Sequence, residues 1–188
     1  GSLEMKRISQ FFYQNSNLRV AVLFTAIFIG YLILILTRKA TGFELSNSDI
    51  KSLGMSFGFD QADITVFFKV RTDDMIDSYI NFNLVWDTLF GLIYGLMYVI
   101  WVSVLFKPFS KKAGRVNLIP LAQVLFDWFE NYTLGSLAQQ YLVDGIITSS
   151  TADLASGFCM IKWTFSGLTY VLILVGVILL IARRFKVK

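Results

Sequence analysis

The sequence contains no histidine and a single cysteine, and both features restrict its chemistry. Without histidine the chain lacks the most common general base and metal ligand, and it cannot form a Ser/His or Cys/His nucleophile pair. A lone cysteine, Cys159, excludes a disulfide within the chain and a multi-cysteine metal site. The sequence therefore predicts no metal and no cofactor, and proton chemistry would have to use carboxylates and lysine.

Charged residues are also scarce. They make up 16% of the 188 residues, against about 25% in ordinary soluble domains, whereas hydrophobic residues reach 55%. This balance excludes disorder and predicts an integral membrane protein in contact with lipids. The net charge of +4 does not indicate nucleic-acid binding, because the basic residues lie in short clusters between apolar segments.

Four segments are long and apolar enough to cross a membrane, which takes about 20 residues per helix. The expected spans are residues 20–37, 84–106, 117–141 and 154–182. We set residues 1–5 aside as an expression remnant with a start methionine and treat 6–188 as one membrane domain. The first span begins like a signal peptide, but Arg38 and Lys39 follow it in place of a small-residue cleavage site, which favours an uncleaved anchor. The fold class is thus an all-α, four-helix membrane bundle.

Basic residues predict the orientation of these spans. Those before the first span, between the second and third, and after the fourth are Lys6, Arg7, Arg19, Lys107, Lys111, Lys112, Arg115, Arg183, Arg184, Lys186 and Lys188. The opposite side has fewer basic residues and most of the acidic ones. By the positive-inside rule both termini are cytoplasmic, which requires the even number of spans found above.

The outer connection between the first two spans, residues 40–83, is too long for a plain loop. Two or three short amphipathic helices are expected there. Residues 46–49 offer N-caps for a first helix that Gly54 would end, and residues 60–70 place apolar side chains on one face at helical spacing. The apolar pattern continues from Met75. Such helices either lie on the outer membrane surface or cap the bundle.

Four charged residues lie within the expected spans: Asp87, Asp127, Glu130 and Lys162. Each costs about 2.5–3.5 kcal/mol at the bilayer centre on insertion scales, so such residues face the bundle interior or water and find partners. At about 1.5 Å per residue, all four lie between the outer end and the midplane, where they can meet. Three carboxylates and one ammonium leave two negative charges, which a proton, a bound cation, a cationic ligand or Arg38 would have to balance.

Helical spacing places polar side chains on the same faces as these charges. Asn131 lies one turn after Asp127, Ser166 lies one turn after Lys162, and Tyr94 shares a face with the acid of the second span. The tryptophans beside Asp127 and Lys162 lie too deep for an interfacial belt, so they line or fill the same space. The predicted ligand-binding residues are Asp87, Tyr94, Asp127, Trp128, Glu130, Asn131, Lys162, Trp163 and Ser166.

Three functions remain open. The first is binding or transport of a small cationic or amphipathic molecule, or a proton, at the carboxylate–lysine cluster; a transporter of four helices is expected to be a homodimer. The second is an intramembrane enzyme acting on a lipid or isoprenoid, with Asp127 or Glu130 as general acid/base and Lys162 stabilising an anion. The third is a structural or assembly protein in which Lys162 pairs with a carboxylate to fix helix register.

Three short motifs, taken in order, resemble those of a largely uncharacterised family of small bacterial four-helix inner-membrane proteins. They are DTLFGLIY from Asp87, DWFEN from Asp127, and KW at Lys162–Trp163. The resemblance covers roughly residues 20–185 and implies a bacterial cytoplasmic membrane, but no activity. Gly91 stands where a proline is expected from the family, which leaves the shape of the second helix open.

Overall fold

The computed structural model describes residues 1–37, 42–46 and 49–186. These residues form helices and loops, with no β-strand among them, which confirms the all-α class. The helices are α1 (Ser2–Asn15), α2 (Leu18–Thr37), α3 (Gln61–Lys69), α4 (Asp73–Asn81), α5 (Asp87–Phe106), α6 (Ser110–Ala113), α7 (Ile119–Asp144) and α8 (Ser149–Lys186).

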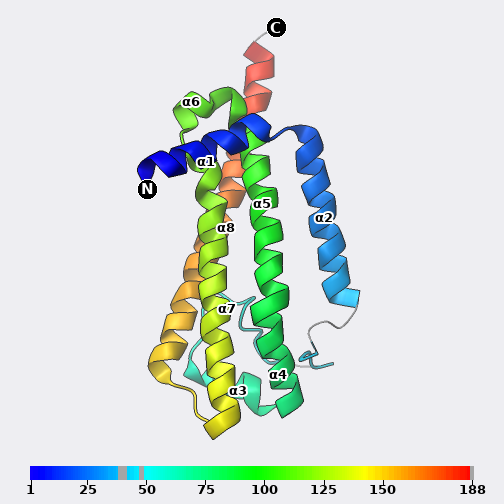
Figure 1. Ribbon diagram of the computed structural model, residues 1–188, viewed down its shortest axis with the longest axis vertical. Coiled ribbons are helices and arrows are strands. Elements are labelled where there is room, and N and C mark those ends of the chain that lie inside the picture. Colours follow the sequence, from blue (N-terminus) through cyan, green and yellow to red (C-terminus); the bar gives the residue numbers. More distant parts are fainter. Residues whose placement is uncertain (38–41, 47–48, 187–188) are drawn as a thin grey trace.

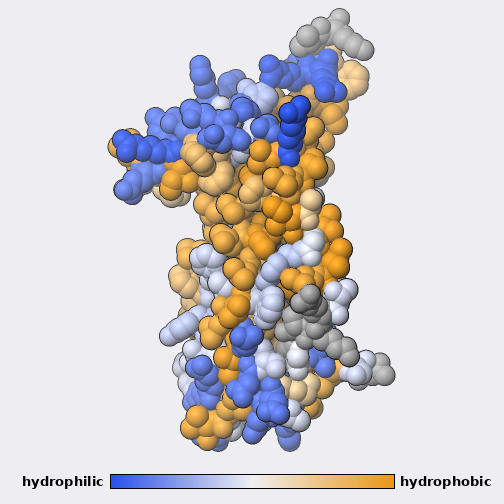
Figure 2. Space-filling model, turned by 45° about the vertical axis from the view of Figure 1, so that its right-hand side comes forward, coloured by the Kyte–Doolittle hydropathy of each residue, from blue (hydrophilic) through white to orange (hydrophobic). Residues whose placement is uncertain are grey.

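Three helical segments are long and apolar enough to cross a membrane: Leu18–Thr37, Asp73–Ala113 and Ser149–Lys186. They contain the first, second and fourth expected spans. The third expected span corresponds to α7, which is 26 residues long but less apolar than the others because it carries amide and carboxylate side chains. Figure 2 shows hydrophobic residues over the middle of the visible face and hydrophilic residues gathered towards its two ends.

The core of the molecule is made by α5, α7 and α8, which run alongside one another, while α2 lies at the edge against α5 (Figure 1). Aromatic stacking of Phe28 on Phe90, with ring centroids 5.5 Å apart, joins α2 to α5. The indole of Trp101 also donates a hydrogen bond of 2.8 Å to the Thr25 hydroxyl. The first expected span is therefore a peripheral helix, and most of its contacts are with α5.

Two glycines allow α5 and α7 to approach closely. A β-carbon at Gly95 would clash with the Val124 side chain, and one at Gly91 would lie 2.9 Å from Nε1 of Trp128. This spacing of small residues is a common device for close helix packing in membranes. At Gly91, side chains of α7 thus occupy the space that a larger residue would need.

A π-helical turn, η1 (Phe82–Trp86), joins α4 to α5 and determines the shape of the second expected span. The Thr88 hydroxyl donates to the carbonyl of Asn83, and the Asn83 side chain donates to the carbonyl of Tyr79. The helix is thus continuous but locally widened directly before Asp87. Turns of this kind occur frequently at functional sites.

The outer connection contains the helix that was predicted in residues 60–70. It does not contain, in its described residues, the short helix that was predicted to end at Gly54. Helix α3 begins with a capping box between Asp60 and Asp63, and its Ile64 and Phe68 are buried. Residues 49–59, by contrast, form turns, with Gly54 inside a turn rather than ending a helix. The helix fails because α8 side chains bind the main chain of this segment, as described below. Asn47 and Ser48, expected as caps, lie outside the described residues.

Helices α3 and α4 cap the ends of α7 and α8, and we call this the cap end. The buried cluster that joins them contains Leu53, Phe59, Ile64, Phe67, Phe68, Ile76, Tyr79, Leu134, Leu137, Ala138, Ile147, Ala152, Ala155 and Cys159. Residues from the connection and from both long helices therefore share one core.

The opposite end, called the basic end, holds an additional helix that the sequence did not predict. Helix α1 includes residues 2–5, which we had set aside, and it crosses the ends of the other helices (Figure 1). The Ser9 hydroxyl donates to Oδ1 of Asn117 at 2.6 Å, and Nδ2 of Asn117 donates to the Ser103 hydroxyl at 3.0 Å. Tyr13 packs against Val102 and its neighbours. The start of α1 and the end of α8 lie at this same end of the molecule.

Candidate functional site

Lys162 is the centre of a buried polar cluster between α7 and α8. Its Nζ lies 2.8 Å from Oε2 of Glu130 and 3.5 Å from Oδ1 of Asp127. It also donates a hydrogen bond of 3.0 Å to the carbonyl of Gly54. The exposed fractions are 7% for Lys162, 4% for Asp127 and 1% for Glu130. Lys162 thus forms two ion pairs and one main-chain hydrogen bond within a buried environment.

Asp127 is held from the side of α5 as well. The Tyr94 hydroxyl donates a hydrogen bond of 2.8 Å to Oδ2 of Asp127, and both groups are buried. The close approach of α5 at Gly91 brings the two helices within this distance. Both oxygens of Asp127 are therefore engaged, one by Lys162 and one by Tyr94.

Asp87 lies next to this cluster but in a different situation. It is the first residue of α5, half-buried, with the side chain of Asn131 as its neighbour. The carboxylates of Asp127 and Glu130 are close enough to repel it. Within the described residues no ion pair involves Asp87. Arg38, the cation suggested by the sequence, lies outside those residues.

Aromatic side chains join α2 to the turn that carries Asp87. Tyr31 of α2 donates its hydroxyl to the carbonyl of Trp86 at 2.6 Å, and its ring stacks on Phe90 with centroids 6.0 Å apart. Phe90 in turn contacts Tyr94 edge to face, with centroids 5.4 Å apart. Aromatic side chains of α2, η1 and α5 thus form a cluster at the turn that carries Asp87, and Tyr31 lies close enough to Asp87 to interact with it electrostatically.

A loop covers the cluster from the cap end; we call residues 52–59 the cover segment. The carbonyl of Gly54 accepts from Lys162 and, at 3.2 Å, from the indole of Trp163. The Cys159 thiol donates to the carbonyl of Ser56 at 3.0 Å. A β-carbon at Gly54 would lie 3.4 Å from Oε1 of Glu130. Side chains of α8 therefore fix the cover segment through its main chain.

The remaining predicted residues divide between the cluster and its surroundings. Trp163 lies within the cluster, and the Nζ of Lys162 lies 5.1 Å from the centroid of its ring. Trp128 is 37% exposed and donates to the carbonyl of Thr88, so it lies on the outer face against α5. Ser166 is 1% exposed, and its hydroxyl has no hydrogen-bond partner in the described part of the chain.

The sequence did not indicate the cover segment as part of the site. Main-chain carbonyls carry no residue signature, so an acceptor such as Gly54 can be recognised only when the fold is known. The only indication in the sequence was that residue 54 is a glycine, which has no side chain. Among the described residues, no group of three or more Cys, Asp and Glu side chains is arranged to hold a metal ion.

The comparisons with known proteins identify no relative. No family model, no curated protein and no solved structure matches this chain. The resemblance to small bacterial inner-membrane proteins therefore stays a prediction, and the function has to be argued from the cluster and its surroundings.

Proposed function

We propose that this chain is an integral membrane protein with four spans and both termini on the cytoplasmic side. The three apolar helical segments support membrane insertion. Helix α7 can supply the fourth span because its polar side chains are buried against other helices, whereas Leu125, Phe129 and Tyr132 are exposed. Such an arrangement presents an apolar face to lipid. The resemblance described above supports the cytoplasmic membrane of a bacterium.

In this membrane the protein binds a small cationic molecule, or a proton, at Asp87. The observation that carries this proposal is that Lys162 forms its ion pairs with Glu130 and Asp127, and that no ion pair among the described residues involves Asp87. One ammonium also cannot balance three carboxylates. A carboxylate within a membrane span needs a counter-charge, and a bound cation or a proton supplies it.

The surroundings of Asp87 favour an organic cation. Tyr31, Trp86 and Phe90 form an aromatic cluster at the turn that carries Asp87, and aromatic faces attract cations that have lost part of their hydration. Asn131 provides a directional hydrogen-bonding group beside the acid. The ligand class is thus a small amphipathic cation, with its charge on Asp87 and its apolar part against the rings.

The Lys162–Asp127–Glu130 group acts in this proposal as the rigid support of the site. Its closed geometry also favours the alternative of a purely structural protein, but that alternative leaves Asp87 without an explanation. An acid/base role of Asp127 or Glu130 receives less support, because Lys162 holds both carboxylates. Transport, and the homodimer expected with it, would be a further property of the same site.

Binding of tetraphenylphosphonium tests the proposal. The full-length protein is reconstituted in lipid nanodiscs, and the bound cation is measured by equilibrium dialysis. We expect saturable binding that weakens at least tenfold in Asp87→Asn, because the variant loses the counter-charge. Asp77→Asn is the matched control: the acid lies on exposed α4 surface, and the variant should bind like the wild type.

A proton and a cation compete for the same carboxylate, so binding should also weaken as the pH is lowered from about 8 to about 5. Circular dichroism and gel filtration check that both variants are folded. Absence of saturable binding by the wild type, or equal binding by wild type and Asp87→Asn, would overturn the proposal.

A further inference from the structure

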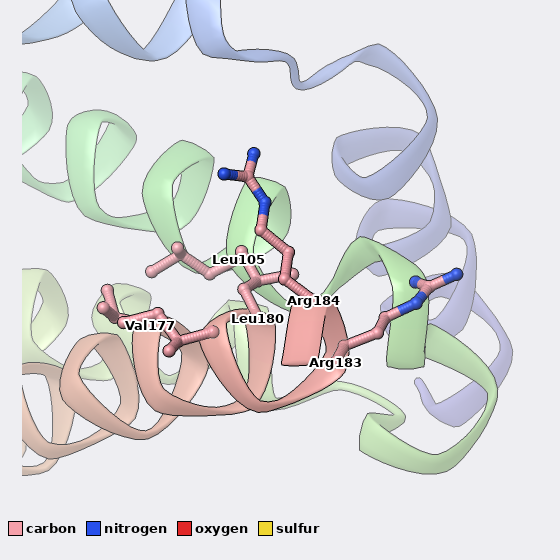
Figure 3. Close-up of a pocket in the computed structure, with 6 residues that line it drawn as sticks. Leu105, Val177, Leu180, Arg183 and Arg184 are labelled. Carbon is pink, nitrogen blue, oxygen red and sulfur yellow. The ribbon is translucent and has the colours of Figure 1, made fainter. Parts of the chain in front are cut away.

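The basic end contains an apolar groove with a charged rim. Leu105 of α5 and Val177, Leu180 and Ile181 of α8 line it, and Arg183 and Arg184 stand at its edge (Figure 3). The groove has a volume of about 610 Å³. None of these six residues is acidic.

The groove exists because α8 is longer than its partner. A β-carbon at Gly176 would lie 2.8 Å from the side chain of Leu105, so α8 and α5 are in close contact at this level. Helix α5 ends at Phe106, whereas α8 continues to Lys186. The last turns of α8 therefore leave apolar side chains such as Ile181, which is 51% exposed, without a helix beside them.

Helix α1 indicates where the membrane surface lies. It crosses the ends of the long helices (Figure 1) and has exposed apolar side chains, including Ile8 and Phe11, beside the basic Lys6 and Arg7. An amphipathic helix with this composition lies in the interface of a bilayer. This inference rests on the proposed membrane insertion, in which the groove at the same end lies at the level of lipid headgroups and the upper part of their acyl chains.

We propose that this groove binds one anionic glycerophospholipid. The acyl chain lies along Leu105, Val177 and Ile181, and the phosphate is bound by Arg183 and Arg184. Guanidinium groups bind phosphate through paired hydrogen bonds, and neither arginine has an ion-pair partner in the part of the chain that the structure describes. An apolar floor below two cations matches an anionic amphiphile. This lipid site is separate from Asp87.

Native mass spectrometry of the full-length protein tests the charged part of the site. The protein is offered phosphatidylglycerol and phosphatidylcholine with the same acyl chains. We expect wild type to retain phosphatidylglycerol preferentially, and Arg183→Gln with Arg184→Gln to reduce that retention about 10- to 30-fold, since a basic residue near an anionic surface contributes about a factor of five. Lys111→Gln with Lys112→Gln is the control, with the same charge change at the same end but outside the groove.

The apolar part is tested by filling the groove. Val177→Trp should lower the retention of phosphatidylglycerol without a change in charge. Val175→Trp is its control, because Val175 is 40% and Val177 39% exposed, but Val175 does not line the groove. Circular dichroism confirms that each variant is folded.

Three outcomes would overturn this proposal. Equal losses in the arginine and lysine double variants would show diffuse attraction of anionic lipid to a basic surface. Equal effects of Val177→Trp and Val175→Trp would show that no chain lies in the groove. Displacement of the lipid by glycerol 3-phosphate at equal concentration would show a site for free phosphate rather than for a lipid.

Discussion

The two ends of helix α8 use their positive charges in opposite ways. Near the cap end, Lys162 is buried and contacts two carboxylates and a carbonyl. At the basic end, Arg183 and Arg184 are exposed and, among the described residues, form no ion pair. The difference follows from depth. A charge in a low-dielectric interior must be paired, whereas an exposed charge is solvated and is available to a ligand.

The same comparison applies to the segments that pack at these two ends. The cover segment is fixed by four side-chain contacts from α8, and its Leu53 is almost fully buried. Helix α1, at the other end, is attached mainly through Asn117 and Tyr13 and leaves one apolar side open. The cap end is thus a closed core, and the basic end is a surface.

Lys162→Met gives the largest expected effect, because it leaves two buried carboxylates without their cation. We expect the free energy of unfolding to fall by about 3–5 kcal/mol, measured by circular dichroism during unfolding in SDS–detergent mixtures. Lys69→Met, on the exposed end of α3, should have almost no effect. Neutralising the partners as well, with Asp127→Asn and Glu130→Gln, should recover most of the loss; no recovery would contradict the ion-pair explanation.

Gly95→Ala tests the close packing below the cluster. The added methyl group meets Val124, and we expect a loss of about 1–3 kcal/mol in the same unfolding measurement. Gly167→Ala is the control, since a β-carbon there has no neighbour within 4 Å and a helical glycine is replaced by a better helix former. Adding Val124→Ala should relieve the clash. If the double variant Gly95→Ala with Val124→Ala is as unstable as Gly95→Ala alone, the clash is not the cause of the loss.

Asn117→Ala sharpens the contrast at the basic end. It removes the hydrogen bonds to Ser9 and Ser103, and we expect about 1–2 kcal/mol of local destabilisation that detaches α1 and leaves the cap end intact. Hydrogen exchange should become faster in residues 2–15 and stay unchanged in the cover segment. Asn15→Ala, on the exposed side of α1, serves as the reference. Faster exchange at both ends would mean that they are coupled.

Thr25→Val gives the smallest expected effect. It removes the acceptor of the Trp101 indole, and a single hydrogen bond of this kind contributes about 0.5–1.5 kcal/mol. The attachment of α2 to α5 should weaken, which tryptophan fluorescence and the unfolding midpoint report. Thr37→Val, at the exposed end of the same helix, should leave both signals unchanged.

The sequence predicted the helical class and the positions of the long helices because these depend on composition and local periodicity. Runs of apolar residues marked α2, α5 and α8, and the helical spacing of apolar side chains in residues 60–70 marked α3. Helix α1 was missed because its buried side includes a serine, Ser9, whose partner Asn117 lies 108 positions away. Such a pair has no local signature.

The sequence also predicted that Asp87, Asp127, Glu130 and Lys162 can meet, because charges in spans find partners and all four lie in the same half of the expected spans. It could not determine how the charges are divided. Only the tertiary structure decided that Lys162 donates to the carbonyl of Gly54 and that Tyr94 donates to the second oxygen of Asp127. Hydrogen bonds and ion pairs depend on particular distances between helices and loops, and in this arrangement Lys162 pairs with Asp127 and Glu130, whereas no ion pair among the described residues involves Asp87.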